Sequence, residues 1–89
     1  MAVIYKHSPT CGLSSMAAGE VRRFMEANPS VPVYLVDVLR DRALSVEVER
    51  RFGIRHESPQ VIVVRAGEPR WSASHRGVVA SALERESAA

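Results

Sequence analysis

The sequence predicts an α/β protein in which a mixed four-stranded sheet is flanked by helices. Short apolar runs rich in β-branched residues alternate with longer amphipathic segments along the first two thirds of the chain. Only turn residues separate the last two strand-like runs, and a final amphipathic segment follows them. The predicted order is β-α-β-α-β-β-α, so the first two strands should be parallel with a right-handed crossover, and the last two should form an antiparallel hairpin.

The first strand is predicted over residues 2–6, which are largely apolar. The helix after it has an apolar face, and the residues of that face are Leu13, Ala17, Val21, Phe24 and Met25. The helix should end near Asn28, because Pro29 cannot continue a helix and disfavours the α conformation in the residue before it. A nearly continuous apolar run at 33–38 then predicts a strand covered on both faces.

A second helix is expected to begin after Asp41, a good N-cap type, and to end at Gly53. Its buried residues should be Leu44, Val48 and Phe52. Residues 61–64 predict a third, buried strand, and a turn at 66–69 leads to a fourth strand at 70–73, polar enough for a position towards an edge. The last helix should begin near Ser74 and pack Val78, Val79, Ala82 and Leu83.

Composition indicates one small domain that spans residues 1–89. The net charge is +2, and the arginines alternate with glutamates as on a solvated helix face, which does not favour nucleic-acid binding. No apolar run reaches the length of a membrane span, and the first residues do not resemble a signal peptide. One cysteine permits no intrachain disulfide, which suits a reducing cytoplasm.

That single cysteine, Cys11, is predicted to lie in the turn between the first strand and the first helix. Unsatisfied N–H groups and the helix dipole favour an anion at this position, so the pKa of the thiol should be lowered and its thiolate available to attack a disulfide. A lone cysteine is more often a small buried hydrophobe. The flanking residues favour the active thiol, because Ser8, Pro9, Thr10 and Gly12 are turn residues and not core residues.

Three groups of residues carry a resemblance to a known family. They are Lys6-His7-Ser8 with Cys11 and Ser14, the string His56-Glu57-Ser58-Pro59-Gln60, and Trp71 with Ser74-His75. Together they closely resemble the YtxJ-type monothiol bacilliredoxins, which are general-stress proteins with a thioredoxin-like fold. The family usually has proline after the cysteine, where this chain has Gly12, so the first helical turn should be looser.

The resemblance implies that Cys11 removes bacillithiol from protein mixed disulfides. Bacillithiol would be a co-substrate, with no tightly bound cofactor, and the partners would be bacillithiolated clients and a low-molecular-weight thiol; we expect a monomer. Ser14 stands where a dithiol relative has its resolving cysteine, so release needs a second thiol molecule or a partner reductase. The Ser14 hydroxyl would either donate a hydrogen bond to the thiolate or satisfy nearby backbone.

The other expected substrate-binding residues are His7, Thr10, His56, Ser58 and Pro59. The resemblance implies a cis peptide bond before Pro59, which would bring the Ser58 backbone close to Cys11 to pair with a client segment. A protonated imidazole of His7 or His56 would lower the pKa of the thiol, unless these are ordinary exposed loop histidines. A neutral structural role is expected for His75, and no metal site is expected because zinc-ligand spacing is absent from the sequence.

Two other functions compete with this interpretation. Cys11-Gly12-Leu13-Ser14 is close to the cysteine-glycine-phenylalanine-serine turn of monothiol glutaredoxins, which carry iron–sulfur clusters. Visible absorbance on purification would identify such a carrier. The chain could instead be a thioredoxin-fold binding module without turnover, in which case Cys11→Ser would keep full biological activity.

Overall fold

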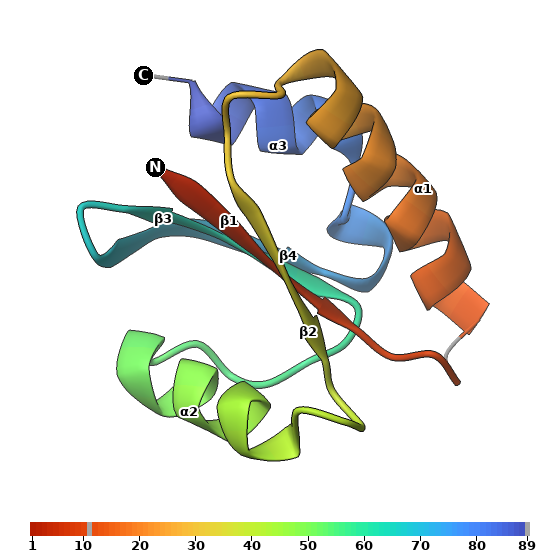
Figure 1. The fold of residues 1–89 in the computed structure, drawn as a ribbon, viewed down its shortest axis with the longest axis vertical. Coiled ribbons are helices and arrows are strands. Elements are labelled where there is room, and N and C mark those ends of the chain that lie inside the picture. The colour runs from red at the N-terminus through yellow and green to blue at the C-terminus, as the bar shows by residue number, and fades with distance from the viewer. Residues whose placement is uncertain (11, 89) are drawn as a thin grey trace.

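The computed structural model describes residues 1–10 and 12–88. In chain order, its elements are β1 Ala2–His7, α1 Gly12–Ala27, β2 Val33–Asp37, α2 Arg42–Phe52, β3 Gln60–Arg65, β4 Glu68–Ser74, the 3-10 turn η1 His75–Gly77 and α3 Ala80–Ser87. This order confirms the predicted β-α-β-α-β-β-α arrangement. Helices α1 and α3 cover one face of the sheet, and α2 covers the other (Figure 1).

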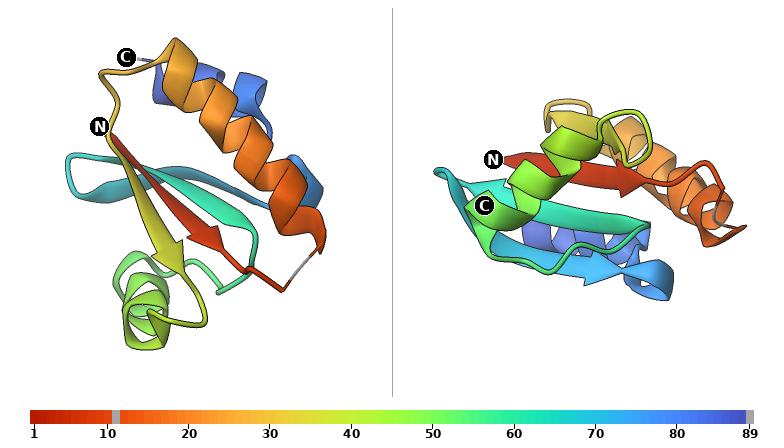
Figure 2. Two further views of the ribbon diagram at one scale, coloured as in Figure 1. Left: turned by 45° about the vertical axis from the view of Figure 1, so that its right-hand side comes forward. Right: turned by 90° about the horizontal axis from the view of Figure 1, so that it is seen from below.

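The sheet has the strand order β2-β1-β3-β4. Strand β1 is central and pairs in parallel with β2, where His7 lies opposite Asp37. It pairs antiparallel with β3, where Lys6 lies opposite Gln60. Strands β3 and β4 form the expected antiparallel hairpin. The carboxyl ends of β1 and β2 and the start of β3 therefore share one edge of the sheet (Figure 2).

Alternation along β1 divides its side chains between the two faces of the sheet. Val3 and Tyr5 belong to the main core beneath α1 and α3, whereas Lys6 contacts His56 on the α2 side. The members of the main core are Val3, Tyr5, Ala17, Val21, Phe24, Val61, Val63, Val78 and Leu83. Within α1 the first buried side chain is Ser14; Leu13 is only half-buried and Met25 is exposed, although both were expected on the apolar face.

The expectation that residues 33–38 are covered on both faces is wrong. Strand β2 ends at Asp37 and is an edge strand. Tyr34 is 59% exposed and Leu35 is 63% exposed, and only Val36 is fully buried. An apolar run alone does not distinguish a central strand from an edge strand, because the distinction depends on which strands pair with it.

Helix α2 begins after Asp41 and ends at Gly53, as expected. Gly53 adopts the left-handed conformation and donates its N–H to the Glu49 carbonyl. The buried face of α2 differs from the expected one, because Ser45 and Val48 are buried while Leu44 is 50% exposed. The helix is therefore rotated so that a serine faces the sheet, close to the buried Lys6.

The last helix begins later than expected. Strand β4 continues to Ser74, and the 3-10 turn η1 then precedes α3, which starts at Ala80. His75 has a φ of 55°, a left-handed conformation that cannot begin an α-helix. At the start of α3, the Ala80 N–H donates a hydrogen bond to Glu20 Oε1 of α1 at 2.9 Å.

Leu83→Ala and Leu44→Ala test the two burial assignments with the same chemical change. Leu83 is completely buried, so its truncation should lower the free energy of unfolding by about 2–5 kcal/mol. Leu44 is half exposed, so its truncation should change that free energy by about 0.5 kcal/mol or less. Urea unfolding measures both values, and equal losses would contradict the observed orientation of α2.

Candidate functional site

The turn after β1 and the loop before β3, which carry most of the expected site residues, lie at the edge where β1 and β2 end, whereas the ring of His56 contacts Lys6 and Ser45 on the α2 side. The turn at Ser8–Thr10 leaves β1 here, and the Val38 N–H after β2 donates to the His7 carbonyl at 3.0 Å. The loop that precedes β3 reaches the same edge because Gln60 pairs with Lys6 (Figure 2). Cys11, the predicted nucleophile, lies outside the described residues, between the turn and the first residue of α1.

Ser14 fastens the turn to the first turn of α1. Its hydroxyl oxygen accepts the Ser8 backbone N–H at 3.3 Å, and its side chain is only 1% exposed. The Ser8 and Thr10 hydroxyls lie 3.2 Å apart and form a further hydrogen bond within the turn. Ser14 therefore satisfies nearby backbone, one of the two roles expected for it. A hydroxyl that accepts one bond still has its own proton to donate.

His7 is held in place by Tyr5 and is not a free loop side chain. Burial raises the pKa of Tyr5 to about 12, so its hydroxyl keeps its proton near neutral pH. The Tyr5 hydroxyl lies 2.9 Å from His7 Nδ1 and 3.4 Å from the Ser14 carbonyl, so it links the imidazole to the first turn of α1. The half-buried His7 ring thus presents its Nε2 away from Tyr5.

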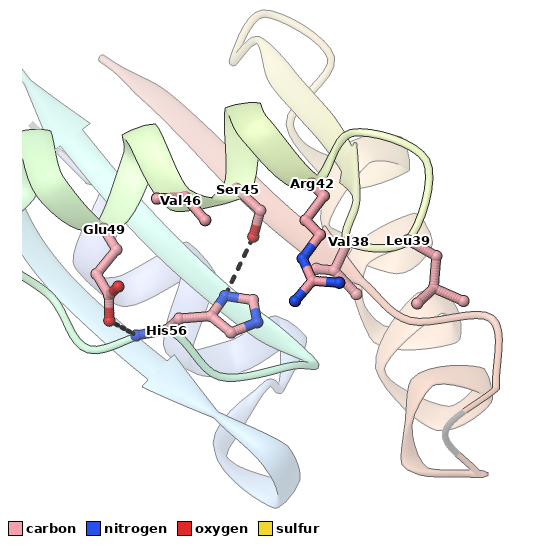
Figure 3. A pocket seen from close by; sticks show the side chains of 7 residues that line it. All are labelled: Val38, Leu39, Arg42, Ser45, Val46, Glu49 and His56. Carbon is pink, nitrogen blue, oxygen red and sulfur yellow. Dashed lines mark hydrogen bonds between the residues drawn. The ribbon is translucent and has the colours of Figure 1, made fainter.

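A polar cluster that sequence analysis did not identify lies on the α2 side of the sheet, where Lys6 and Ser45 are buried and His56 is exposed. Lys6 is the only lysine of the chain, and it is completely buried. Its Nζ lies 3.1 Å from His56 Nδ1, and Ser45 Oγ lies 3.1 Å from the same nitrogen. The His56 backbone N–H donates to Glu49 Oε2 at 2.7 Å (Figure 3). A lone lysine at the end of an apolar strand was the available sequence signal.

Burial governs the protonation of this cluster. It lowers the pKa of Lys6, and the nearby Glu49 carboxylate opposes that shift. Burial also lowers the pKa of His56, and the positive charge of Lys6 lowers it further. The protonated imidazole expected at His56 is therefore disfavoured. Because an ammonium group can only donate, His56 Nδ1 accepts from Lys6 and the ring proton resides on Nε2.

The His56–Gln60 string fixes the loop between α2 and β3. The Ser58–Pro59 peptide bond is cis, as the family resemblance implied. Pro59 is buried, and its carbonyl accepts the His75 N–H at 2.8 Å. Gln60 donates its amide to the Arg55 carbonyl at 2.9 Å. The half-buried Ser58 is thereby held at the sheet edge that also bears the Ser8–Thr10 turn.

Glu57 and His75 lie side by side behind this loop. His75 Nε2 is 3.4 Å from Glu57 Oε2. Hydrogen bonds from Ser74 and then from His75 lower the pKa of the Glu57 carboxyl group. This contact joins the loop to η1, so His75 has a structural contact but not at the start of the last helix, where it was expected.

A surface pocket of about 380 Å³ opens beside the Lys6 cluster (Figure 3). Its lining residues are Val38, Leu39, Arg42, Ser45, Val46, Glu49 and His56. Over residues 1–10 and 12–88, no group of three or more histidine, cysteine, aspartate or glutamate side chains is placed to hold a metal ion. No helix in that part of the chain is long and apolar enough to cross a membrane.

Comparison with solved structures shows the fold class of the protein. A structure described as a candidate oxidoreductase with a thioredoxin fold matches with a TM-score of 0.89 and 29% identity, over 98% of this chain and 77% of the other. Fasciola hepatica thioredoxin matches with a TM-score of 0.75 and 16% identity, over 97% and 76% of the two chains. Thioredoxin 1 from Thermosipho africanus gives 0.73 and 14%, over 96% and 92%. The chain therefore has a thioredoxin fold.

The family follows from a second comparison. The family model described as monothiol bacilliredoxin BrxC matches residues 1–83. The chain thus belongs to the monothiol bacilliredoxin family, in agreement with the resemblance found in the sequence. Family and fold together support a thiol–disulfide redox function.

Lys6→Met tests the protonation of the Lys6 cluster. Because the folded state lowers the pKa of Lys6 below 10.5, the unfolded chain binds more protons between the folded-state pKa and 10.5, and the wild-type stability should rise as the pH rises through that window. The methionine variant lacks this dependence. It should be more stable than wild type near pH 7, by on the order of 1 kcal/mol. Its advantage should shrink towards pH 10.5.

Urea unfolding of both proteins between pH 7 and pH 10 measures this difference. A difference that stays constant with pH would mean that the Lys6 pKa is not lowered. The comparison isolates one group, because Lys6 is the only lysine in the chain.

Proposed function

We propose that this protein is a monothiol thiol–disulfide oxidoreductase that removes bacillithiol from client proteins through Cys11. The proposal rests on the residues at the site in a chain of the bacilliredoxin family. The one cysteine follows the Ser8–Thr10 turn, and a serine occupies the buried position three residues later. Such a site has one thiol available for exchange and no second thiol to resolve it.

The reaction requires two exchanges. The Cys11 thiolate attacks the bacillithiol sulfur of the mixed disulfide, so the client sulfur leaves as a thiolate and takes a proton from solvent. Cys11 then carries bacillithiol as a new disulfide. A second bacillithiol thiolate attacks the adduct's bacillithiol sulfur, which releases bacillithiol disulfide and regenerates the Cys11 thiolate. The net exchange reduces the client cysteine at the expense of one free bacillithiol, which leaves joined to the transferred bacillithiol as a disulfide.

The surrounding residues supply four roles in this proposal. The Ser14 hydroxyl proton is available to the thiolate, and the ring of His7 forms a wall of the site, with its orientation set by Tyr5. Thr10 lies exposed in the turn, where it can contact the incoming substrate. The backbone of Ser58, ahead of the cis Pro59, can pair with an extended client segment as an added strand.

The role proposed for His56 differs from the protonated ring that the sequence analysis considered. Its lowered pKa favours the neutral ring, so it does not supply the positive charge that would lower the Cys11 pKa. It contributes instead an Nε2–H donor to the pocket beside α2.

We extend the proposal to a monomer that works in the cytoplasm on bacillithiolated clients. The single cysteine of the chain suits a reducing compartment. The monomer is proposed because exchange with an external thiol needs no second protein chain.

An iron–sulfur carrier is the second candidate function, favoured by the turn Cys11-Gly12-Leu13-Ser14. Such a carrier would share a cluster between two chains, each giving one cysteine. It should therefore purify as a coloured dimer when iron and sulfide are supplied. A colourless protein under those conditions that still releases bacillithiol would be the bacilliredoxin.

Ser14→Cys tests the one-thiol mechanism. After one equivalent of a bacillithiol mixed disulfide, the intact mass of wild type should show a single adduct on Cys11. In Ser14→Cys the new thiol is three residues after Cys11 in the sequence and should expel the adduct from within the molecule. That variant should show the loss of two hydrogens and no adduct.

Ser15→Cys is the matched control. Ser15 is exposed on α1, whereas Ser14 is buried beneath the turn. This control should keep its adduct. If wild type itself cleared the adduct without added thiol, another chain's Cys11 would be the resolver, and the proposed mechanism would be wrong.

A further inference from the structure

The pocket beside α2 opens at the same edge of the sheet as the Ser8–Thr10 turn, the redox turn of the proposed function. Val38 and Leu39, which line it, directly follow β2. The Val38 N–H is bonded to the carbonyl of His7, the last residue of β1, and the turn begins at the next residue. A small molecule joined to a sulfur at the turn can therefore extend along this edge towards the pocket.

Two hydrogen-bond donors face each other across the pocket. Figure 3 shows the guanidinium of Arg42 directed into it from the start of α2, with the ring of His56 on the opposite wall. Since His56 Nδ1 accepts from Lys6, its Nε2 carries the proton and is a donor. Figure 3 shows this second ring nitrogen on the Arg42 side. The space between them suits a group that only accepts hydrogen bonds.

The charges on the pocket wall favour an anion at the Arg42 end. Glu49 and Lys6 interact electrostatically, and Glu49 Oε2 is already engaged by the His56 backbone N–H. Glu49 also lies seven residues after Arg42, about 10 Å along the helix. Among residues 1–10 and 12–88, no salt bridge involves Arg42, whereas Arg23, Arg50 and Arg85 each contact a glutamate.

The remaining walls are apolar and suit the carbon skeleton of a small ligand. Val38, Leu39 and Val46 provide them. A charged anchor beside an apolar wall is the usual composition of a small-molecule site. A planar guanidinium with two forward N–H groups matches a carboxylate in particular.

We infer that this pocket binds the carboxylate end of the small thiol that Cys11 removes. Arg42 and the Nε2–H of His56 hold the carboxylate, and the thiol's sulfur lies at the redox turn. The inference rests on the proposed function and adds how the thiol is recognised: by a carboxylate distant from its sulfur, held in the pocket beside α2. Arg42 is then a specificity residue, because it contacts the substrate away from the sulfur atoms that react.

Paired mixed disulfides of one client protein test the inference. One carries bacillithiol, which bears malate carboxylates, and the other carries 2-mercaptoethanol, which bears none. Arg42→Ala should lower kcat/KM about tenfold or more for the bacillithiol substrate, the usual effect of losing a hydrogen bond to a charged group. It should leave the 2-mercaptoethanol substrate within about twofold of wild type.

Arg40→Ala is the matched control because it removes the same charge two residues earlier, from the loop that precedes α2. Arg40 is exposed and does not line the pocket. Arg40→Ala should have the wild-type kcat/KM for both substrates. The inference is overturned if Arg42→Ala slows both substrates equally or slows neither, or if Arg40→Ala reproduces its effect, which would indicate only a long-range attraction of charge.

A binding measurement separates this inference from the proposed function. Malate is titrated into the Cys11→Ser protein while the ring signals of His56 are followed by NMR. Saturable shifts that Arg42→Ala abolishes support the pocket even if wild type releases neither small thiol, an outcome that would refute the proposed function alone. If wild type releases neither thiol and malate leaves His56 unchanged, both proposals fail.

Discussion

The position of β1 between two other strands is the constraint on which the rest of the structure depends. Its pairing with β2 and β3 fixes its register, and alternation then sends neighbouring side chains to opposite faces. Tyr5 and His7 therefore support the redox turn beneath α1, while Lys6 supports the loop and pocket beneath α2. A slip of one residue would exchange the two sets and dismantle both halves of the site.

The buried Lys6 is unfavourable for stability and useful for the site. A charged group without water is stabilised only by the partners around it, here His56 and Glu49, and its lowered pKa reflects an incomplete compensation. The same contact fixes the His56 tautomer and so directs a ring proton into the pocket. In a small protein, an interaction that reduces stability and orders a surface side chain is most simply explained by that side chain's function.

The sequence predicted the element order, the hairpin and the end of α2 at Gly53, because each depends on local periodicity or turn chemistry. It did not predict the exposure of Leu35 and Leu44, since burial depends on which strand lies at the edge and how a helix is rotated over the sheet. For the site, motifs identified the turn and the cis Pro59. Ser45 and Arg42 carry no motif, and only the packing of α2 brings them to His56.

A one-thiol mechanism gives the pocket a role that a dithiol enzyme would not need. A dithiol protein clears its adduct with its own second sulfur, whereas this chain has Ser14 at that position and, in the proposed mechanism, would depend on an external thiol. The adduct would then have to persist without trapping a client again. A carboxylate held by Arg42 would keep the bound thiol oriented along the sheet edge, leaving the disulfide accessible from the other side. Recognition of the small thiol then replaces the missing cysteine as the feature that makes the cycle productive.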